Sequence, residues 1–203
     1  MSENPADSLL RPQRLYSRAE FFTNPCPVPA KRGVYAWYFS EIPPGVPTSG
    51  CVTFDGHTLL YLGISPKNDS SSQNLRKRIR HHYGGNAEGS TLRLTLGVLL
   101  AEKSDFPLRR VGSGSRMTLT HLGEQCLDQW LNNNARICWL EHDQPWVLEE
   151  ELLTRLSLPL NLQGNSHHPF STQLTGLRQE AKRAARDMPI AQEGNQQRRI
   201  KPC

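Results

Sequence analysis

Glu149 is the residue whose surroundings in the sequence most clearly demand a chemical explanation. In residues 145–156 the leucines recur at helical spacing and form one apolar face, and Glu149 falls in the middle of that face. An unpaired carboxylate on a buried face costs several kcal/mol, roughly, unless a cation or a hydrogen-bond donor compensates it. Glu149 therefore needs a partner, and the sequence leaves two candidates, a metal ion or a structural arginine.

A second feature is a run of cations with no acid among them, an arrangement that attracts phosphate groups. On a helix, Leu75, Ile79 and Tyr83 stack as the buried stripe of this segment, because residues i, i+4 and i+8 share a face. The cations around that stripe are Arg76, Lys77, Arg78, Arg80, His81 and His82.

Arg78 and His82 border the buried stripe and are neighbours at i and i+4, so packing can hold both side chains at a site. Lys77, Arg80 and His81 point to solvent, where they would meet phosphates without specificity. The structural alternative is that Arg78 caps a carbonyl group while His82 fills a groove in the core.

Two tyrosines each share a strand face with a glycine. Alternation places Tyr35 with Gly33 in residues 33–39, and Tyr61 with Gly63 in residues 59–64. A glycine removes side-chain cover from its face, which would let a ligand approach the phenol groups. The alternative is that both tyrosines are core aromatics whose hydroxyls reach water.

Asn161 lies between Leu160 and Leu162, so we expect a buried amide that locks neighbouring backbone or a side chain through hydrogen bonds. His167 and His168 follow it, but their spacing matches no closed set of zinc ligands. This segment therefore favours a structural amide over a zinc site.

The remaining pattern predicts a mixed α/β chain. β-branched and aromatic residues predict strands at 33–39, 59–64 and 135–141, and helical spacing predicts helices at 73–83, 92–100, 121–131, 145–156 and 172–188. Proline and glycine predict a long loop between the first two strands, and residues 106–116 predict a Gly- and Ser-rich loop.

Composition excludes several classes of protein. The chain has 24 Lys and Arg against 19 Asp and Glu, a net charge of +5. No apolar run approaches the roughly 20 residues needed to span a bilayer, and the first residues lack a signal-peptide pattern. We expect a soluble cytoplasmic protein without membrane contact, and the sequence specifies no protein partner.

Taken in order, the motifs described above resemble the GIY-YIG nuclease superfamily. They are Gly33-Val34-Tyr35, Tyr61-Leu62-Gly63, the helix with Leu75-Arg76-Lys77-Arg78-Ile79, and the late Glu149 and Asn161. No one motif is specific, but Glu149 stands twelve residues before Asn161, as in the nuclease half of the bacterial excision-repair incision subunit.

The resemblance implies an α/β (α+β) domain over residues 32–170, with a small three-stranded antiparallel sheet flanked by helices. Residues 1–31 would then be an irregular N-terminal arm. Residues 171–188 would form a C-terminal helix, and residues 189–203 a disordered basic tail.

The resemblance also implies a metal-dependent DNA endonuclease that hydrolyses phosphodiester bonds with one Mg²⁺ or Mn²⁺ ion. By position, Tyr35 and Tyr61 match the two motif tyrosines and Arg78 matches the helix arginine. Glu149 matches the metal-binding glutamate, and Asn161 the late asparagine.

This sequence departs from the family pattern at two places. The 26 residues from Tyr35 to Tyr61 are a longer gap than in the repair and homing members, although restriction members also carry insertions there. No histidine follows in the loop after the basic helix, which leaves His82 as the candidate, four residues after Arg78, as in restriction members. The general base is therefore either Tyr35 or His82.

A noncatalytic nucleic-acid-binding module that keeps the fold and the basic helix is the competing interpretation. Such a module could lose Glu149 or Arg78 freely, and both residues are present, which favours the enzyme. Under either interpretation the residues expected to contact nucleic acid are Arg76, Lys77, Arg80 and His81.

Overall fold

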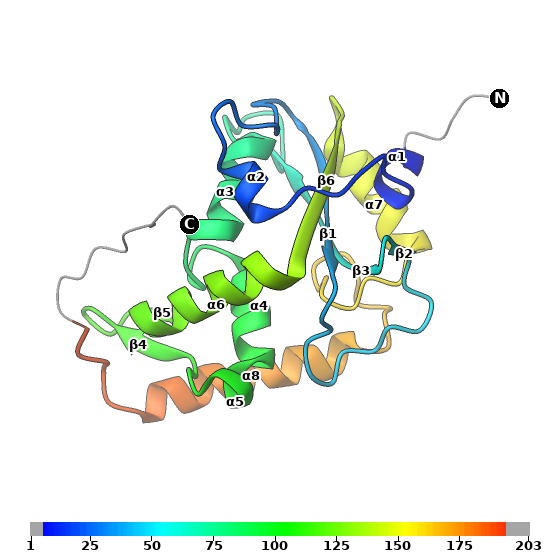
Figure 1. Ribbon diagram of the computed structural model, residues 1–203. Helices are drawn as coiled ribbons and strands as arrows, with labels where there is room; N and C mark the ends of the chain where they lie inside the picture. The colour runs from blue at the N-terminus through cyan, green and yellow to red at the C-terminus, as the bar shows by residue number, and fades with distance from the viewer. Residues whose placement is uncertain (1–5, 194–203) are drawn as a thin grey trace.

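The computed structural model describes residues 6–193, which fold around a four-stranded antiparallel sheet (Figure 1). The strand order is β2-β3-β1-β6, with β2 (Thr53–Phe54), β3 (His57–Ser65), β1 (Gly33–Phe39) and β6 (Ala135–Glu141). The three strands expected from the sequence are present, but the prediction of a three-stranded sheet is wrong because β2 adds a fourth.

The extra strand β2 comes from the segment that the sequence predicts to be a long loop. Asp55 and Gly56, between β2 and β3, have φ angles of 47° and 70°. Two successive positive φ angles are typical of the two-residue type I′ hairpin turn, for which Asp-Gly is a preferred dipeptide. The sequence prediction missed this hairpin because the prolines and glycines earlier in the segment indicate an irregular loop.

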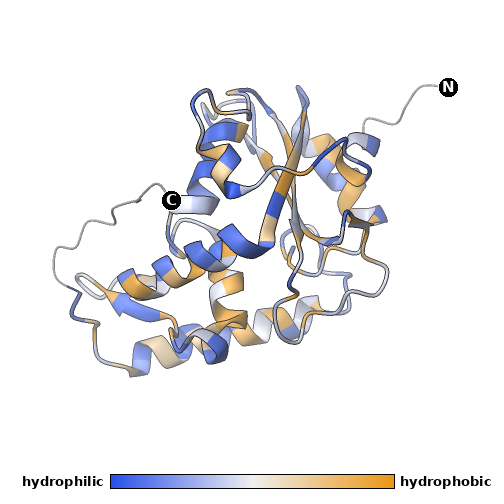
Figure 2. Ribbon diagram, viewed as in Figure 1, coloured by the Kyte–Doolittle hydropathy of each residue, from blue (hydrophilic) through white to orange (hydrophobic). Residues whose placement is uncertain are grey.

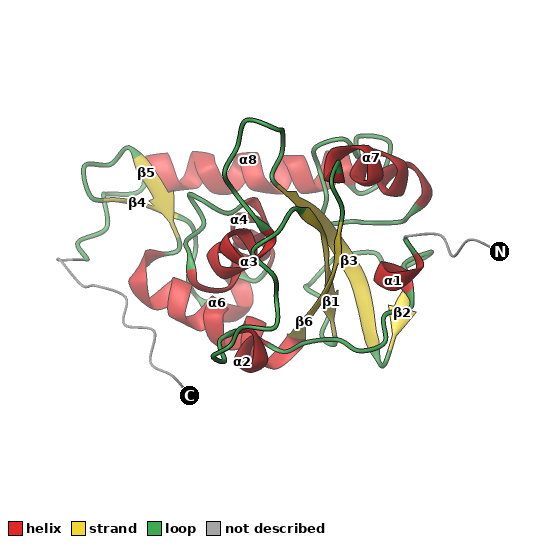
Figure 3. Cartoon of the chain, turned by 90° about the horizontal axis from the view of Figure 1, so that it is seen from above, coloured by secondary structure: helices red, strands yellow, loops and turns green. Residues whose placement is uncertain are grey.

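Helices cover both faces of the sheet (Figure 3). On one face lie α1 (Asp7–Leu10) and α7 (Pro145–Arg155); on the other lie α3 (Leu75–Gly84), α4 (Thr91–Leu99) and α6 (Thr120–Asn134), with α8 (Ser171–Asp187) packed against α4. The short helices α2 (Arg18–Phe21) and α5 (Ala101–Ser104) complete the set. Within residues 6–193, none of the helices has the length and apolarity to span a membrane.

Alternation along β1 gives the sheet two separate cores. Tyr35 and Trp37 belong to the core beneath α3 and α4, whereas Val34 and Tyr38 belong to the core beneath α1 and α7. Every residue of β1 is buried, as expected for a central strand covered on both faces. In Figure 2, hydrophobic residues follow β6 and α4, and hydrophilic residues cover much of α3 and α6.

A second correction concerns residues 106–116, where the sequence predicts an irregular loop. The structure has an antiparallel hairpin here, made of β4 (Arg109–Val111) and β5 (Arg116–Thr118). Gly112 and Gly114 at its tip have φ angles of 61° and 90°, which glycine adopts without strain. Ala191 pairs with β4, so the first part of the expected tail contacts the hairpin, while residues 194–203 lie outside the described residues.

The N-terminal arm packs on the sheet. Apart from α1 and α2 it is irregular, but Leu9, Phe21 and Val28 are fully buried. Tyr16 exchanges two backbone hydrogen bonds with Ile137, of 2.8 and 2.9 Å. The arm thereby covers the outer edge of β6, which would otherwise present unpaired backbone groups to solvent.

Gly33 lets two neighbouring elements approach β1 closely. A Cβ atom at this position would lie 2.1 Å from the carbonyl oxygen of Leu140 in β6 and 2.9 Å from the side chain of Leu75 in α3. The carbonyl belongs to the paired backbone of the sheet, so it cannot move without breaking the ladder. Gly33 therefore serves packing, and not the ligand access that the sequence suggested.

We expect Gly33→Ala to lower the free energy of unfolding by about 2 kcal/mol, because the added methyl group meets backbone that cannot yield. Gly176→Ala in α8 is the matched control, since a Cβ atom there meets nothing within 4 Å. The control should raise stability by up to about 1 kcal/mol through helix propensity. Urea unfolding followed by circular dichroism measures both changes, and equal effects of the two substitutions would contradict the packing role.

Candidate active site

A pocket of about 640 Å³ opens beside β3, beyond the short β2. It brings together five of the six residues that the sequence predicts to be catalytic, and they come from five different parts of the fold. These are Tyr35 from β1, Tyr61 from β3, Arg78 from α3, Glu149 from α7 and Asn161 from the segment after α7. The sixth, His82, does not line the pocket.

Strand register places the two tyrosines side by side. Tyr35 pairs with Gly63 and Trp37 pairs with Tyr61, so both phenols project from the same face of the sheet. A Cβ atom at Gly63 would lie 2.5 Å from the Tyr35 hydroxyl oxygen. Gly63 therefore makes room for the ring of Tyr35, and the expectation that it opens this face to a ligand is corrected.

His82 lies behind Tyr35 in the core and has no exposed surface. Its Nε2 atom is 2.8 Å from the Tyr35 hydroxyl oxygen, and its Nδ1 atom is 2.7 Å from the hydroxyl oxygen of Ser90. Ser90 is the N-cap of α4 and accepts a hydrogen bond from the backbone N–H of Arg93. The imidazole is thus fixed at both nitrogens, and only the Tyr35 end of this chain reaches the pocket.

Burial keeps both ends of the Tyr35–His82 pair neutral at pH 7. It raises the pKa of Tyr35 well above its ordinary range, and the nearby Tyr61 adds to this effect while Arg78 opposes it. Burial also lowers the pKa of His82 well below its ordinary range, and the positive charge of Arg78 acts in the same direction.

Arg78 is the cation of the basic helix that faces the pocket. Its Nη1 atom donates to the carbonyl oxygen of Gly89 at 3.4 Å, a long hydrogen bond that leaves most of the guanidinium available to a ligand. Half-buried on a helix at the pocket wall, it combines a fixed position with a permanent positive charge.

The other predicted nucleic-acid-binding residues lie away from the pocket. Arg76 donates to the carbonyl oxygen of Val28 in the N-terminal arm at 2.7 Å. Arg80 is exposed and sits over the ring of Phe22, with 5.3 Å from its guanidinium carbon to the ring centroid. Lys77 is exposed.

His81, the fourth of these residues, folds back toward the loop after α3. Its ring lies against Gly85 and Gly89, where an added Cβ atom would come within 3.0 and 2.3 Å of it. Burial lowers its pKa, and the charge of Arg78 does so further. The expectation that His81 points to solvent is therefore corrected to a half-buried position.

Glu149 reaches the pocket without an arginine partner. Burial raises the pKa of its carboxyl group from the ordinary 4.5 to about 7, while the positive charge of Lys67 opposes the rise. Across residues 6–193 we find no hydrogen bond or ion pair to this carboxylate. Of the two partners that the sequence left open, the structural arginine is not found among the described residues.

The donors around Glu149 fit one hard cation held largely by water and substrate oxygens. The described residues contain no group of three or more His, Cys, Asp and Glu side chains that could enclose a metal ion. The described residues therefore form no closed zinc site. Glu149 and the exposed Glu150 both line this open pocket, which suits Mg²⁺ or Mn²⁺, since such ions are bound through one or two carboxylates and keep several waters.

Asn161 forms the buried structural amide that the sequence predicts. Its Oδ1 atom accepts from the backbone N–H of Leu62 at 2.9 Å, and its Nδ2 atom donates to the carbonyl oxygen of Leu62 at 2.8 Å. The backbone N–H of Leu160 adds a hydrogen bond to the carbonyl oxygen of Leu60 at 3.1 Å. This segment therefore caps the outer edge of β3 next to Tyr61.

Sequence reasoning missed Arg178, which lines the pocket from α8. In the sequence it is one of 24 Lys and Arg residues, and it belongs to none of the motifs described above. A signal was present, because Arg178 falls on the helical stripe formed by Leu174, Ala181 and Ala185. This is the same pattern that singles out Glu149 on α7.

The raised pKa of Glu149 predicts how stability depends on pH. The folded-state pKa of about 7 lies above the ordinary value of 4.5, so the contribution of Glu149 to stability is largest below pH 4.5 and is lost as the pH rises through 7. Glu149→Gln should therefore match the parent near pH 4 and exceed its free energy of unfolding by about 2–3 kcal/mol at pH 8 in chelator. Urea unfolding at both pH values measures this difference, and a difference that is independent of pH would contradict it.

A known protein family matches most of this chain. The family model described as the GIY-YIG catalytic domain matches residues 33–180, a span that contains both tyrosines, Arg78, Glu149 and Asn161. Searches of curated proteins and of solved structures each gave no match. Because the family match covers well over half of the 203 residues, the chain belongs to the GIY-YIG catalytic domain family.

Proposed function

We propose that this protein is a divalent-metal-dependent DNA endonuclease that hydrolyses phosphodiester bonds. Membership of the GIY-YIG catalytic domain family indicates a nuclease and a nucleic acid substrate. The observation that carries the finer proposal is the unpaired carboxylate of Glu149 in the same pocket as Tyr35, Tyr61 and Arg78. A carboxylate, a guanidinium and a phenol are the groups that a phosphodiester hydrolysis with one metal ion requires.

Glu149 would hold the ion, Mg²⁺ or Mn²⁺, together with water and substrate oxygens. When bound, the ion supplies Lewis-acid stabilisation of the negative charge that develops on the phosphate and the leaving oxygen. Its charge would also draw the proton from Glu149, because a nearby cation lowers the pKa of a carboxyl group. The cost of burying this carboxylate in the metal-free protein supports a role in ligand binding.

Tyr35 would take the proton of the attacking water. Tyr35 lines the pocket, and its hydroxyl is hydrogen-bonded to Nε2 of His82. Proton transfer from water to the phenol oxygen can therefore accompany transfer of the phenol proton to His82. The two candidates for the general base then act in series, with Tyr35 touching the water and His82 accepting the proton behind it.

Arg78 and Tyr61 would bind the phosphate that is attacked. The Arg78 guanidinium acts on both tyrosines electrostatically, so it lies close enough to neutralise charge that develops between them. The Tyr61 hydroxyl would orient the water or a phosphate oxygen. Asn161 acts indirectly, because its amide holds the backbone next to Tyr61.

The outer cations would contribute affinity and no chemistry. Lys77 and Arg80 are exposed on α3, the helix that carries Arg78, and would meet the backbone phosphates on either side of the pocket. Arg76 and His81 are half-buried against neighbouring segments and would act through the local positive potential.

The proposal is tested with the parent protein and its Glu149→Ala variant on labelled single-stranded, duplex and branched DNA, in Mg²⁺, in Mn²⁺ and in chelator. We expect metal-dependent cleavage by the parent and at least about a hundredfold loss in the variant, with DNA binding nearly unchanged. Glu151→Ala is the matched control, since Glu151 is exposed on the same helix and pairs with Arg155. It should cleave like the parent.

Two outcomes would overturn the assignment. Binding without cleavage of any substrate by the parent would favour the noncatalytic nucleic-acid-binding module. Equal losses of binding and cleavage in a folded Glu149→Ala variant would make Glu149 a structural residue.

The role of Tyr35 is tested by removing its hydroxyl alone. Tyr35→Phe should lower kcat by about a hundredfold or more, because the proton acceptor is lost. Tyr38→Phe is the control on the same strand, since Tyr38 is equally buried but donates to the carbonyl oxygen of Leu9 at 2.7 Å on the opposite face. It should lose about 1 kcal/mol of stability and keep kcat. Similar kcat values for the two variants would argue against Tyr35 as the acceptor.

A further inference from the structure

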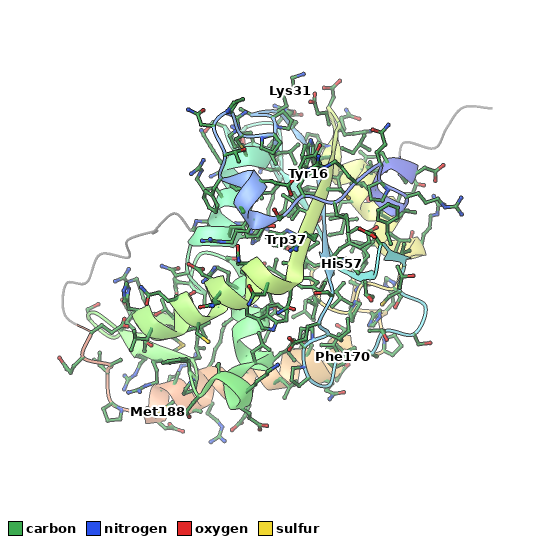
Figure 4. The ribbon with its side chains drawn as sticks, in the orientation of Figure 1. Tyr16, Lys31, Trp37, His57, Phe170 and Met188 are labelled. Atoms are coloured by element: carbon green, nitrogen blue, oxygen red, sulfur yellow. The ribbon has the colours of Figure 1, made fainter. Side chains whose placement is uncertain are left out.

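Arg178 is a cation that α8 contributes to the pocket from outside the motif segments. Helix α8 runs along one side of the molecule between Phe170 and Met188 (Figure 4) and packs against α4, which carries Thr91 and Thr95 at the pocket wall. Arg178 lies near the middle of α8, and its side chain lines the pocket that contains Arg78 and Glu149. The helix thus brings a second guanidinium to the pocket.

No acid in the described residues pairs with Arg178. On the same helix, Arg183 is exposed and forms ion pairs with Glu180 at 2.6 Å and with Asp187 at 3.8 Å. Arg178 is half-buried, no ion pair or hydrogen bond engages it within residues 6–193, and burial lowers its pKa. A desolvated guanidinium without a carboxylate partner is suited to receive an anion from outside the protein.

The wall of the pocket that carries Arg178 is separate from the strands that carry the tyrosines. Arg178 belongs to α8, which packs against α4, whereas Tyr35 and Tyr61 belong to the neighbouring strands β1 and β3. An anion bound by Arg178 would therefore lie at the α8 wall of the pocket. A polynucleotide strand supplies such an anion, because each nucleotide adjoining the scissile bond carries its own phosphate.

We infer that Arg178 binds the backbone phosphate adjoining the scissile one and so sets the register of the DNA strand in the pocket. This assignment rests on the proposed function for its reference to a scissile bond. Arg178 does not touch the reacting atoms and is a positioning residue. A guanidinium can hold a phosphate through two parallel hydrogen bonds, which fixes the orientation of the strand as well as its position.

The test measures DNA binding separately from cleavage. Fluorescence anisotropy with a fluorescein-labelled duplex oligonucleotide of 20 base pairs gives Kd over a series of salt concentrations, with every substitution made in the Glu149→Ala background. Arg178→Gln should weaken binding about tenfold at fixed salt, as expected for loss of a charge-assisted contact. It should also reduce the slope of log K against log salt by about one.

Arg183→Gln is the matched control, because it removes the same charge from the same helix at a solvent-facing position. It should change the slope by less than half as much as Arg178→Gln. Arg178→Lys keeps the positive charge and should restore most of the slope, which a purely structural role for Arg178 would not predict. With Glu149 intact, Arg178→Gln should raise KM about tenfold and leave kcat within about threefold of the parent.

The results separate this inference from the proposed function. Equal slopes for Arg178→Gln and Arg183→Gln, or a fall in kcat with unchanged binding, would overturn the role of Arg178 while leaving the endonuclease proposal intact. A parent that binds DNA but cuts none would overturn the endonuclease proposal, and the slope would still decide whether Arg178 holds a backbone phosphate. Thermal denaturation confirms that each variant is folded, and a failure of Arg178→Lys to fold would identify Arg178 as structural.

Discussion

The buried guanidinium of Arg93 is the interaction on which the rest of the site depends. It has no exposed surface, donates to both Glu124 and Asp128 of α6, and also donates to the carbonyl oxygen of His82 at the end of α3. Removing one partner of such a buried network typically costs about 3–5 kcal/mol, because an uncompensated charge remains in the core. The network fixes α3 against α4, and the distance between these helices sets the hydrogen bond between Ser90 and His82.

The outer edge of β3 is the second constraint. Where β2 ends, this edge would leave backbone groups unpaired beside the pocket. The side chain of Asn161 forms hydrogen bonds with both the backbone N–H and the carbonyl oxygen of Leu62 there. The same segment returns the chain from α7, on one face of the sheet, to α8, on the other face. Glu149 and Tyr61 can therefore meet in one pocket although α7 and Tyr61 belong to different cores.

Burial in the pocket affects its carboxyl, phenol and imidazole groups differently from its guanidinium groups. Burial disfavours charge on Glu149, Tyr35 and His82, and within residues 6–193 none of the three is offset by an ion pair. Arg78 and Arg178 keep their charge because a guanidinium does not lose its proton in proteins. The pocket therefore combines the guanidinium groups of Arg78 and Arg178 with the carboxyl groups of Glu149 and Glu150, so it offers oxygen ligands to a metal ion and positive charge to an anionic strand.

The sequence by itself determined the local features. Leu75, Ile79 and Tyr83 specified the buried face of α3, and the apolar stripe of α7 singled out Glu149, because helical and strand periodicities depend only on neighbours along the chain. Only the tertiary structure decided that His82 lies behind Tyr35, that no arginine of the described residues pairs with Glu149, and that Arg178 lines the pocket. Each of these depends on contacts between elements distant in sequence, and burial and electrostatic environment are properties of those contacts, which no local pattern encodes.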